Sequence, residues 1–295
     1  MKRSFLTLAL IASSQLFAAP EPRLLINASS EAALQPGAPA VVELKYIDKN
    51  EKGEEEVVKD IKTVMGKTMH FVVVKSDLSS FAHFHPFFDP MTGIFQAPIH
   101  LPTSHPDNQD ATRAFPEAGD YLIYSEVKST SKGILIHALD QKTAGTPVFH
   151  ELHPDIPHTD GTYVHYLNEK GQKAEAGARY RTEVTIAQTA GEGGDLFNFE
   201  FLLKEKTDSG YKEVESLQPW LMMGGHAILL SSRGETAKDH VFAHEHSGRP
   251  EKGGRLHFSY FARGGMAPDL YRMWMQFKHN GTVLTLPLTF AYPLQ

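Results

Sequence analysis

The sequence predicts an all-β protein built from two tandem β-sandwich domains. Segments of strand length, apolar or alternating, recur along the 295 residues, and Gly, Pro, Asn and Asp turn signals separate them about every 8–12 residues. No segment shows a convincing amphipathic helical period. A shift of 156 positions also aligns residues 40–76 with residues 196–232 without a gap. Residues with matching roles at one long period indicate two copies of one domain.

The N-terminus is predicted to be a cleaved signal peptide. Lys2 and Arg3 precede an apolar run over 5–17, which ends in the small residues Ala18 and Ala19. This run is too short to span a membrane and has the organisation of a secretory signal. We expect cleavage after Ala18, a periplasmic or secreted location, and no membrane span once residues 1–18 are removed.

The remaining chain divides into a first β-sandwich domain over 19–140, a linker over 141–177 and a second β-sandwich domain over 178–295. The linker is rich in Pro, Gly and His, has no repeat partner, and is expected to hold one hairpin near 163–170. In the first domain we expect strands over 23–26, 40–47, 57–64, 69–74, 80–85, 94–97, 121–127 and 133–139. In the second domain we expect strands over 181–186, 196–204, 214–221, 226–230 and 242–246.

The tripeptide Gly119-Asp120-Tyr121 makes the predicted sandwiches immunoglobulin-like. It resembles the start of strand F in immunoglobulin-like folds, where a tyrosine hydroxyl bonds back to the chain at a corner. The match is short, so it supports the class of fold and leaves the topology open.

Composition excludes several functions. The chain has no cysteine, which rules out disulfides and any thiolate site for zinc or copper. A net charge of -6 and the lack of a basic run argue against nucleic-acid partners. Histidine is the unusual count, at 16 residues, and several of them cluster.

The chemistry concentrates in a histidine pattern within the first repeat. His70 opens an apolar strand, and His83 and His85 close the next one. If Asp77 and Leu78 form the turn of a hairpin, Val72 pairs with His83 and His70 with His85. Alternate residues of a strand share a face, so all three imidazoles fall on one face and converge at distances suited to one metal ion.

The second repeat preserves this arrangement. His226 opens a strand, and His244 and His246 close the next one. The turn between the two strands is longer than in the first repeat, but if His226 pairs with His246, all three histidines still lie on the same face. His240 lies on the same side if its strand extends that far. Three imidazoles with an open fourth position suit zinc or copper(II) better than magnesium or calcium. The predicted metal ligands are therefore His70, His83, His85, His226, His244 and His246.

Other candidate ligands are weaker. Thioethers bind copper(I), but Met65, Met69, Met222 and Met223 are each better explained as core residues. A lone histidine on a strand is usually packed and hydrogen-bonded, and we expect this for His100, His105, His137, His257 and His279. The linker histidines, His150, His153, His158 and His165, are expected to be solvated or to add ligands.

The chain also resembles a bacterial secreted domain family. The resemblance rests on the segment from Leu217 to His226, on His244-Glu245-His246 and on Tyr271 to Gly281, with His83-Phe84-His85-Pro86 in the first copy. These match patterns of the type L-x-P-Y-L-x-x-x-G-H, H-V-H-P and Y-R-L-F-x-x-F, and the two copies cover most of the chain beyond the signal. The family is loosely similar to YtkA-like and CopC-like β-sandwich proteins, which implies a periplasmic role in copper handling. The chain departs from the pattern after His246, where it lacks the proline, and in its longer preceding loop.

Three functions follow as alternatives. The first is a non-enzymatic periplasmic protein that sequesters or delivers copper, or zinc, and whose partners are the metal ion and another periplasmic or membrane protein. The second is a cupin-like metalloenzyme, since an acid, Asp89 or Glu251, follows each His-x-His. The order of its histidines differs from a cupin's, and we identify no general base or substrate cleft. The third is a structural or adhesive sandwich protein whose histidines are incidental.

Overall fold

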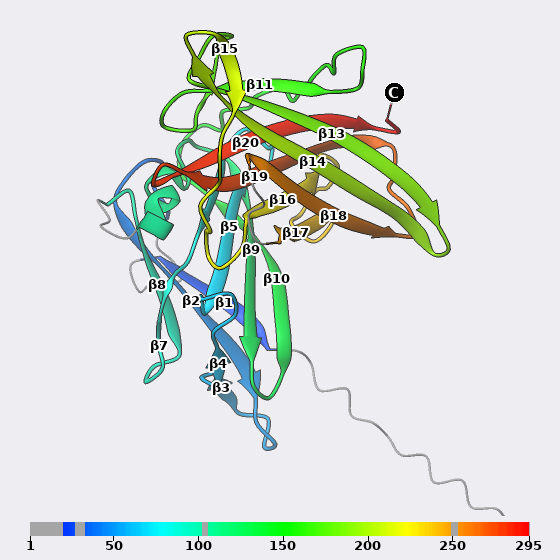
Figure 1. The fold of residues 1–295 in the computed structure, drawn as a ribbon. Coiled ribbons are helices and arrows are strands. Elements are labelled where there is room, and N and C mark those ends of the chain that lie inside the picture. The colour runs from blue at the N-terminus through cyan, green and yellow to red at the C-terminus, as the bar shows by residue number, and fades with distance from the viewer. Residues whose placement is uncertain (1–19, 27–32, 102–105, 249–252, 295) are drawn as a thin grey trace, which may run out of the picture.

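The computed structural model describes residues 20–26, 33–101, 106–248 and 253–294 (Figure 1). Its regular structure is almost entirely antiparallel β-sheet in two repeats, which confirms the predicted fold class. The expected signal peptide and the residues His105 and Glu251 lie outside the described residues. Among the described residues, no helix is both long enough and apolar enough to cross a membrane.

The first repeat consists of two antiparallel sheets. One has the order β1-β2-β8-β7, with β3 paired to β2; the other has the order β10-β9-β5-β6, with β4 paired to β9. The strands are β1 (Glu21–Ile26), β2 (Ala40–Lys49), β3 (Glu55–Val57), β4 (Ile61–Lys62), β5 (Met69–Lys75), β6 (Phe81–Phe84), β7 (Phe87–Asp89), β8 (Ile94–Ile99), β9 (Asp120–Ser129) and β10 (Gly133–Lys142).

The second repeat uses the same order of equivalent strands. Its His-bearing sheet is β17-β16-β19-β20, and the other is β12-β11-β13-β14-β15, with β18 paired to β14. The strands are β11 (Tyr163–Leu167), β12 (Lys173–Ala174), β13 (Tyr180–Gly191), β14 (Gly194–Thr207), β15 (Gly210–Glu213), β16 (Gly225–Ser231), β17 (Phe242–Ser247), β18 (Arg255–Arg263), β19 (Asp269–His279) and β20 (Thr282–Tyr292). Strands β11 and β12 fall within the stretch predicted as a linker and join this sheet.

Each repeat encloses its own apolar core between its two sheets. In the first, Leu44 of β2 and Phe95 of β8 pack with Phe71 and Val73 of β5. A tyrosine closes a corner in each repeat: the hydroxyl of Tyr121 donates to the carbonyl of Glu117 at 2.9 Å, and that of Tyr271 donates to the carbonyl of Ala267 at 2.9 Å. The tyrosine corner expected at Tyr121 is therefore present and is repeated.

A third apolar cluster joins the two repeats. Strand β5 is buried along its whole length because its odd-numbered residues face the core of the first sandwich, whereas Val72 and Val74 face the second repeat. They pack in one cluster with Ile228 and Leu230 of β16. The two His-bearing sheets therefore lie against each other, in the region of Figure 1 where β5 and β9 approach β16 and β17.

The interface between the repeats has internal two-fold character. Phe81 stacks on Trp274 with ring centroids 4.8 Å apart, and the equivalent pair, Phe242 and Tyr124, stacks at 4.1 Å. Each stack joins one repeat to the other. The same surface of each repeat therefore contacts its equivalent on the other repeat. Such an isologous interface is typical of two-fold symmetric dimers, and here it forms between two repeats of one chain.

One element of the first repeat was not expected. The region over 86–114 was predicted as a loop with a single strand, but it contains β7, β8 and the 3₁₀ helix η1 (Pro106–Arg113). Asn108 and Asp110 of η1 accept hydrogen bonds from the backbone amides of His85 and His83. This helix therefore fixes the strand that carries the His-x-His motif.

Candidate metal centre

The structure brings together the three histidines predicted in the first repeat. Val72 pairs with His83 across β5 and β6, which confirms the expected register. Because His70 and His83 both face away from the sandwich core, their rings meet on the interface side. Together with His85 they offer one nitrogen each, and these nitrogens all lie within 4.8 Å of one another.

The second repeat reproduces this arrangement. His226 pairs directly with His246, and Ile228 pairs with His244, as the parity argument predicted. The ligand nitrogens of these three histidines also lie within 4.8 Å of one another. We refer to His70, His83 and His85 as triad 1, and to His226, His244 and His246 as triad 2.

The ring positions show that the two triads have nearly the same shape. In triad 1 the rings of His70 and His83 are 5.6 Å apart, and in triad 2 the equivalent rings of His226 and His244 are 5.7 Å apart. The ring centroids of His70 and His85 are 5.0 Å apart in triad 1, and those of the equivalent His226 and His246 are 4.7 Å apart in triad 2. Two chain segments that share few residue identities thus produce one three-imidazole geometry.

The triads also face each other across the interface between the repeats. The ring of His70 lies 4.9 Å from that of His244, and the ring of His83 lies 5.3 Å from it. These separations are no larger than those within a triad. The fourth position that the sequence left open in each triad is therefore bordered by histidines of the other repeat.

Burial keeps these imidazoles neutral. The side chains of His70, His83 and His226 are at most 4% exposed, and that of His244 is 3% exposed. Burial, reinforced by neighbouring histidines, lowers the pKa of His70 to about 2. It also lowers the pKa of His83 and holds the pKa values of His226 and His244 well below the usual range. A neutral imidazole presents the lone pair that a metal ion requires.

Among the described residues, several ring nitrogens of the two triads are buried without a hydrogen-bond partner, as are single ring nitrogens of three histidines elsewhere. In the triads they are Nε2 of His70, Nε2 of His244, Nε2 of His246 and both ring nitrogens of His226. An unsatisfied buried polar atom costs about 1–3 kcal/mol, so native proteins rarely bury one, let alone a group of them facing each other. Binding a metal ion would satisfy such a group.

Two hydrogen bonds cross between the repeats and orient one histidine of each triad. Nδ1 of His83 lies 2.8 Å from the amide oxygen of Gln276, and Nδ1 of His244 lies 3.1 Å from a carboxylate oxygen of Glu126. Both oxygens accept, so Nδ1 carries the proton and Nε2 keeps its lone pair for a ligand bond. The amide nitrogen of Gln276 donates in turn to Asp110 at 2.8 Å.

Sequence reasoning missed these partners, although a signal for them was present. Glu126 lies opposite His70 in the sheet, and Gln276 lies opposite His226. The alignment of 120–124 with 270–274 extends by two residues to pair them. Both are polar residues that occupy equivalent positions directly opposite the lone histidine of a triad, a pattern typical of a site.

The two ends of the centre differ in how they are covered. The ring of Trp220 lies 4.7 Å from that of His226 in triad 2, and also 6.0 Å from His83 and 6.5 Å from His85 in triad 1. The repeat alignment places Val64 at the position equivalent to Trp220, and a small pocket there is lined by Val64, Thr68, His70 and Glu126. One side of the centre therefore has a small opening beside His70, whereas the equivalent position on the other side holds an indole ring.

The remaining predicted ligands lie outside both triads. His240 precedes β17 and donates from Nδ1 to the carbonyl of Ser231 at 2.7 Å. Met69 lies in the first sandwich core, as expected, whereas Met222 is 71% exposed, so its assignment to the core was wrong. A turn with positive φ at Leu221 and Met222 directs that side chain outward. Among the described residues, the groups able to hold a metal do not include His100, His137, His150, His153, His158, His165, His257 or His279.

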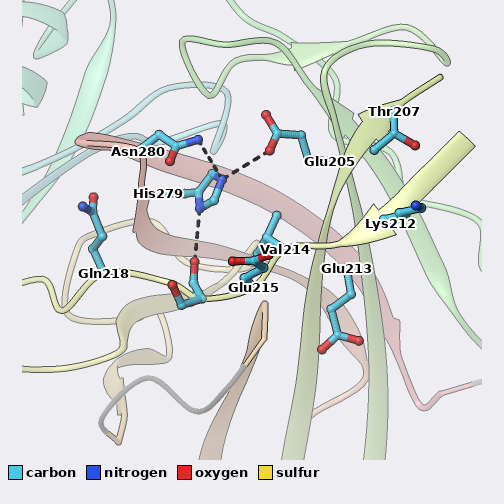
Figure 2. A pocket seen from close by; sticks show the side chains of 10 residues that line it. Glu205, Thr207, Lys212, Glu213, Val214, Glu215, Gln218, His279 and Asn280 are labelled. Atoms are coloured by element: carbon cyan, nitrogen blue, oxygen red, sulfur yellow. Dashed lines mark hydrogen bonds and ion pairs between the residues drawn. The ribbon is translucent and has the colours of Figure 1, made fainter. Parts of the chain in front are cut away.

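A cleft on the second repeat offers no comparable chemistry (Figure 2). His279 lies within it and is satisfied: its Nδ1 donates to the carbonyl of Ser216 at 3.3 Å and its Nε2 accepts from Asn280 at 3.0 Å. This is the packed, hydrogen-bonded role expected for His279. The acidic residues Glu205 and Glu213 at the cleft pair with Arg179 and Arg255.

Comparison with known proteins identifies a family. No curated protein matches the chain. One family model, described as "Domain of unknown function (DUF8832)", matches residues 26–140 and again residues 176–293. The two matches cover most of the sequence and coincide with the two repeats that carry triads 1 and 2. The chain therefore belongs to the DUF8832 family, with two copies of its domain in tandem.

Proposed function

We propose that this protein binds a transition-metal ion, copper first and zinc second, and that it sequesters or delivers the ion in the periplasm without catalysing a reaction. The observation that carries the proposal is the set of buried, neutral imidazole nitrogens without partners, contributed by two triads of matching geometry. Within proteins, a metal ion is the ligand that satisfies several imidazole lone pairs at once.

The ligand chemistry selects the class of ion. Nitrogen ligands suit copper and zinc, whereas calcium and magnesium require oxygen ligands. Within triad 1, Nδ1 of His70 donates a hydrogen bond to Nε2 of His83 at 3.4 Å, which leaves the lone pair of the His70 ring on its unpartnered Nε2. One nitrogen from each histidine of a triad lies within 4.8 Å of the other two, close enough for small side-chain shifts to bring all three to about 2.0–2.1 Å from one ion. The sequence resemblance to YtkA-like and CopC-like proteins favours copper over zinc.

The surroundings of the triads favour holding an ion over catalysis. The triads lie between the two His-bearing sheets, with one small pocket beside triad 1. The cupin-like alternative requires the acid that follows a His-x-His motif to lie at the metal. Asp89 instead accepts hydrogen bonds from Thr92 and from the backbone of Met91 in a surface turn. A buried site of this kind exchanges its ion slowly, as suits sequestration or controlled delivery.

The proposal is tested by isothermal titration of the mature protein, without a polyhistidine tag, with copper(II) and with zinc(II). We expect tight binding of at least one ion, and a rise in unfolding free energy of about 4 kcal/mol at a free ion concentration 1,000 times the dissociation constant. A variant with His70, His83 and His85 replaced by alanine should bind more weakly.

The matched control replaces the exposed histidines His153 and His158 by alanine, which should leave binding unchanged. If neither ion binds, or if the melting temperature is the same with and without each ion, the histidines are structural and the proposal is wrong.

A further inference from the structure

We infer that triads 1 and 2 form a single two-ion centre shared by the two repeats, in which each repeat orients a ligand of the other. This inference rests on the proposed metal binding and adds its architecture: two neighbouring ions, each held by the histidines of one repeat and by an orienting hydrogen bond from the other repeat.

The distances between rings support one centre. His70 and His244, from different repeats, have ring centroids 4.9 Å apart, closer than His70 and His83 within triad 1, at 5.6 Å. His83 and His226 are 5.9 Å apart, and His70 and His226 are 6.1 Å apart. Ions held by the two triads would therefore be near neighbours, with these four rings between them.

The number of ligand atoms supports two ions. Structural and catalytic sites of this class use three or four protein ligands for each ion. Six imidazoles exceed what one four-coordinate ion takes, and they divide by geometry into two groups of three. The matching shapes of the groups imply that each is complete enough to hold an ion of its own.

The crossed hydrogen bonds make each triad depend on the other repeat. Gln276 of the second repeat holds Nδ1 of His83, and Glu126 of the first repeat holds Nδ1 of His244. In each case the bond points Nε2 toward the centre. Partners of this kind fix the tautomer and the ring orientation of a metal ligand, and their loss typically weakens metal affinity about 10–100-fold. Glu126 and Gln276 are therefore positioning residues that act across the interface.

The first experiment counts the ions and measures their separation. The protein is loaded with copper(II), and separately with zinc(II), and the bound ions are counted by native mass spectrometry. For the copper form, we expect two ions per chain and an electron paramagnetic resonance spectrum showing magnetic interaction between them. With His226, His244 and His246 replaced by alanine, one ion should remain, with the spectrum of an isolated copper(II).

The outcomes separate this inference from the proposed function. One ion per chain, or two copper ions with independent spectra, overturns the shared two-ion centre and leaves metal binding intact. If zinc alone binds, the inference requires two zinc ions per chain. It also requires that replacing the histidines of triad 2 by alanine changes the zinc affinity of triad 1; an unchanged affinity overturns the inference. Binding of neither ion overturns both proposals.

The second experiment does not depend on replacing buried histidines. In Glu126→Ala, which removes the acceptor for His244, one of the two stepwise dissociation constants should rise about 10–100-fold. Glu126→Gln retains an acceptor oxygen and should restore the affinity and the copper spectrum. The exposed Glu56→Ala is the matched control. Equal constants in Glu126→Ala and the unaltered protein would overturn the crossed positioning.

Discussion

Mild acid should destabilise the metal-free protein strongly. The cause is the set of buried histidines whose folded-state pKa lies below the value of about 6.5 expected in the unfolded chain. A lowered folded pKa means that the unfolded chain binds more protons as the pH falls through 6.5. Stability is therefore fully present above that pH and is lost below it. The most buried contributors are His70, His83, His226 and His244.

The magnitude follows from this linkage. Between pH 7.5 and pH 5.5, each histidine that stays neutral when folded costs about 1.4 kcal/mol, so His70, His226 and His244, whose pKa values are lowered most, cost about 4 kcal/mol together. Glu245 acts in the opposite direction, because burial raises its pKa to about 7. Acidification removes that penalty and returns at most about 2 kcal/mol, less with solvent screening. The raised pKa of the partly buried Glu126 acts in the same direction as that of Glu245, so the net loss is about 2 kcal/mol, a substantial part of a typical total stability of about 5–15 kcal/mol.

Urea unfolding of chelator-treated protein at the two pH values measures this loss. In His226→Asn, one fewer buried imidazole should make the loss smaller by about 1.4 kcal/mol, whereas in Glu245→Gln it should be larger. Metal-loaded protein should keep its stability to lower pH, because protons then compete with the ion. A loss below about 1 kcal/mol in the metal-free protein would refute the assignment of neutral, buried imidazoles.

Two further predictions concern the scaffold. Lys75→Met should destabilise the protein by about 3–5 kcal/mol in urea unfolding. The Asp77 carboxylate is 2% exposed and lies 3.2 Å from the Lys75 ammonium, so the substitution leaves a buried charge without its cation. The control is Lys142→Met, whose side chain is 85% exposed; a change above about 0.5 kcal/mol there would contradict the argument. Tyr121→Phe removes the hydroxyl that donates to the carbonyl of Glu117 and accepts from its amide, and Tyr271→Phe removes the hydroxyl that donates to the carbonyl of Ala267. Each should cost about 1 kcal/mol or more, measured as a shift in the unfolding midpoint, and a cost in only one of them would show that the two corners are not equivalent.

Local periodicity was sufficient to predict each triad. The two-residue alternation of β5 and β16 determines which histidines share a face, and this depends only on residues close together in the chain. The pairing of His226 with His246 therefore followed from the sequence. The same alternation assigned Met69 to the core, where it lies.

Only the tertiary structure decided what covers that face. Val72 and Val74 are apolar on the side of β5 that faces away from its own sandwich, and their partners, Ile228 and Leu230, lie more than 150 positions away in the chain. No local pattern encodes the orientation of one repeat on the other, because it results from packing between whole surfaces. That packing brings His70 to His244, Glu126 to His244 and Gln276 to His83. The sequence alone thus determined two sets of three histidines, and the fold placed them in one enclosed centre.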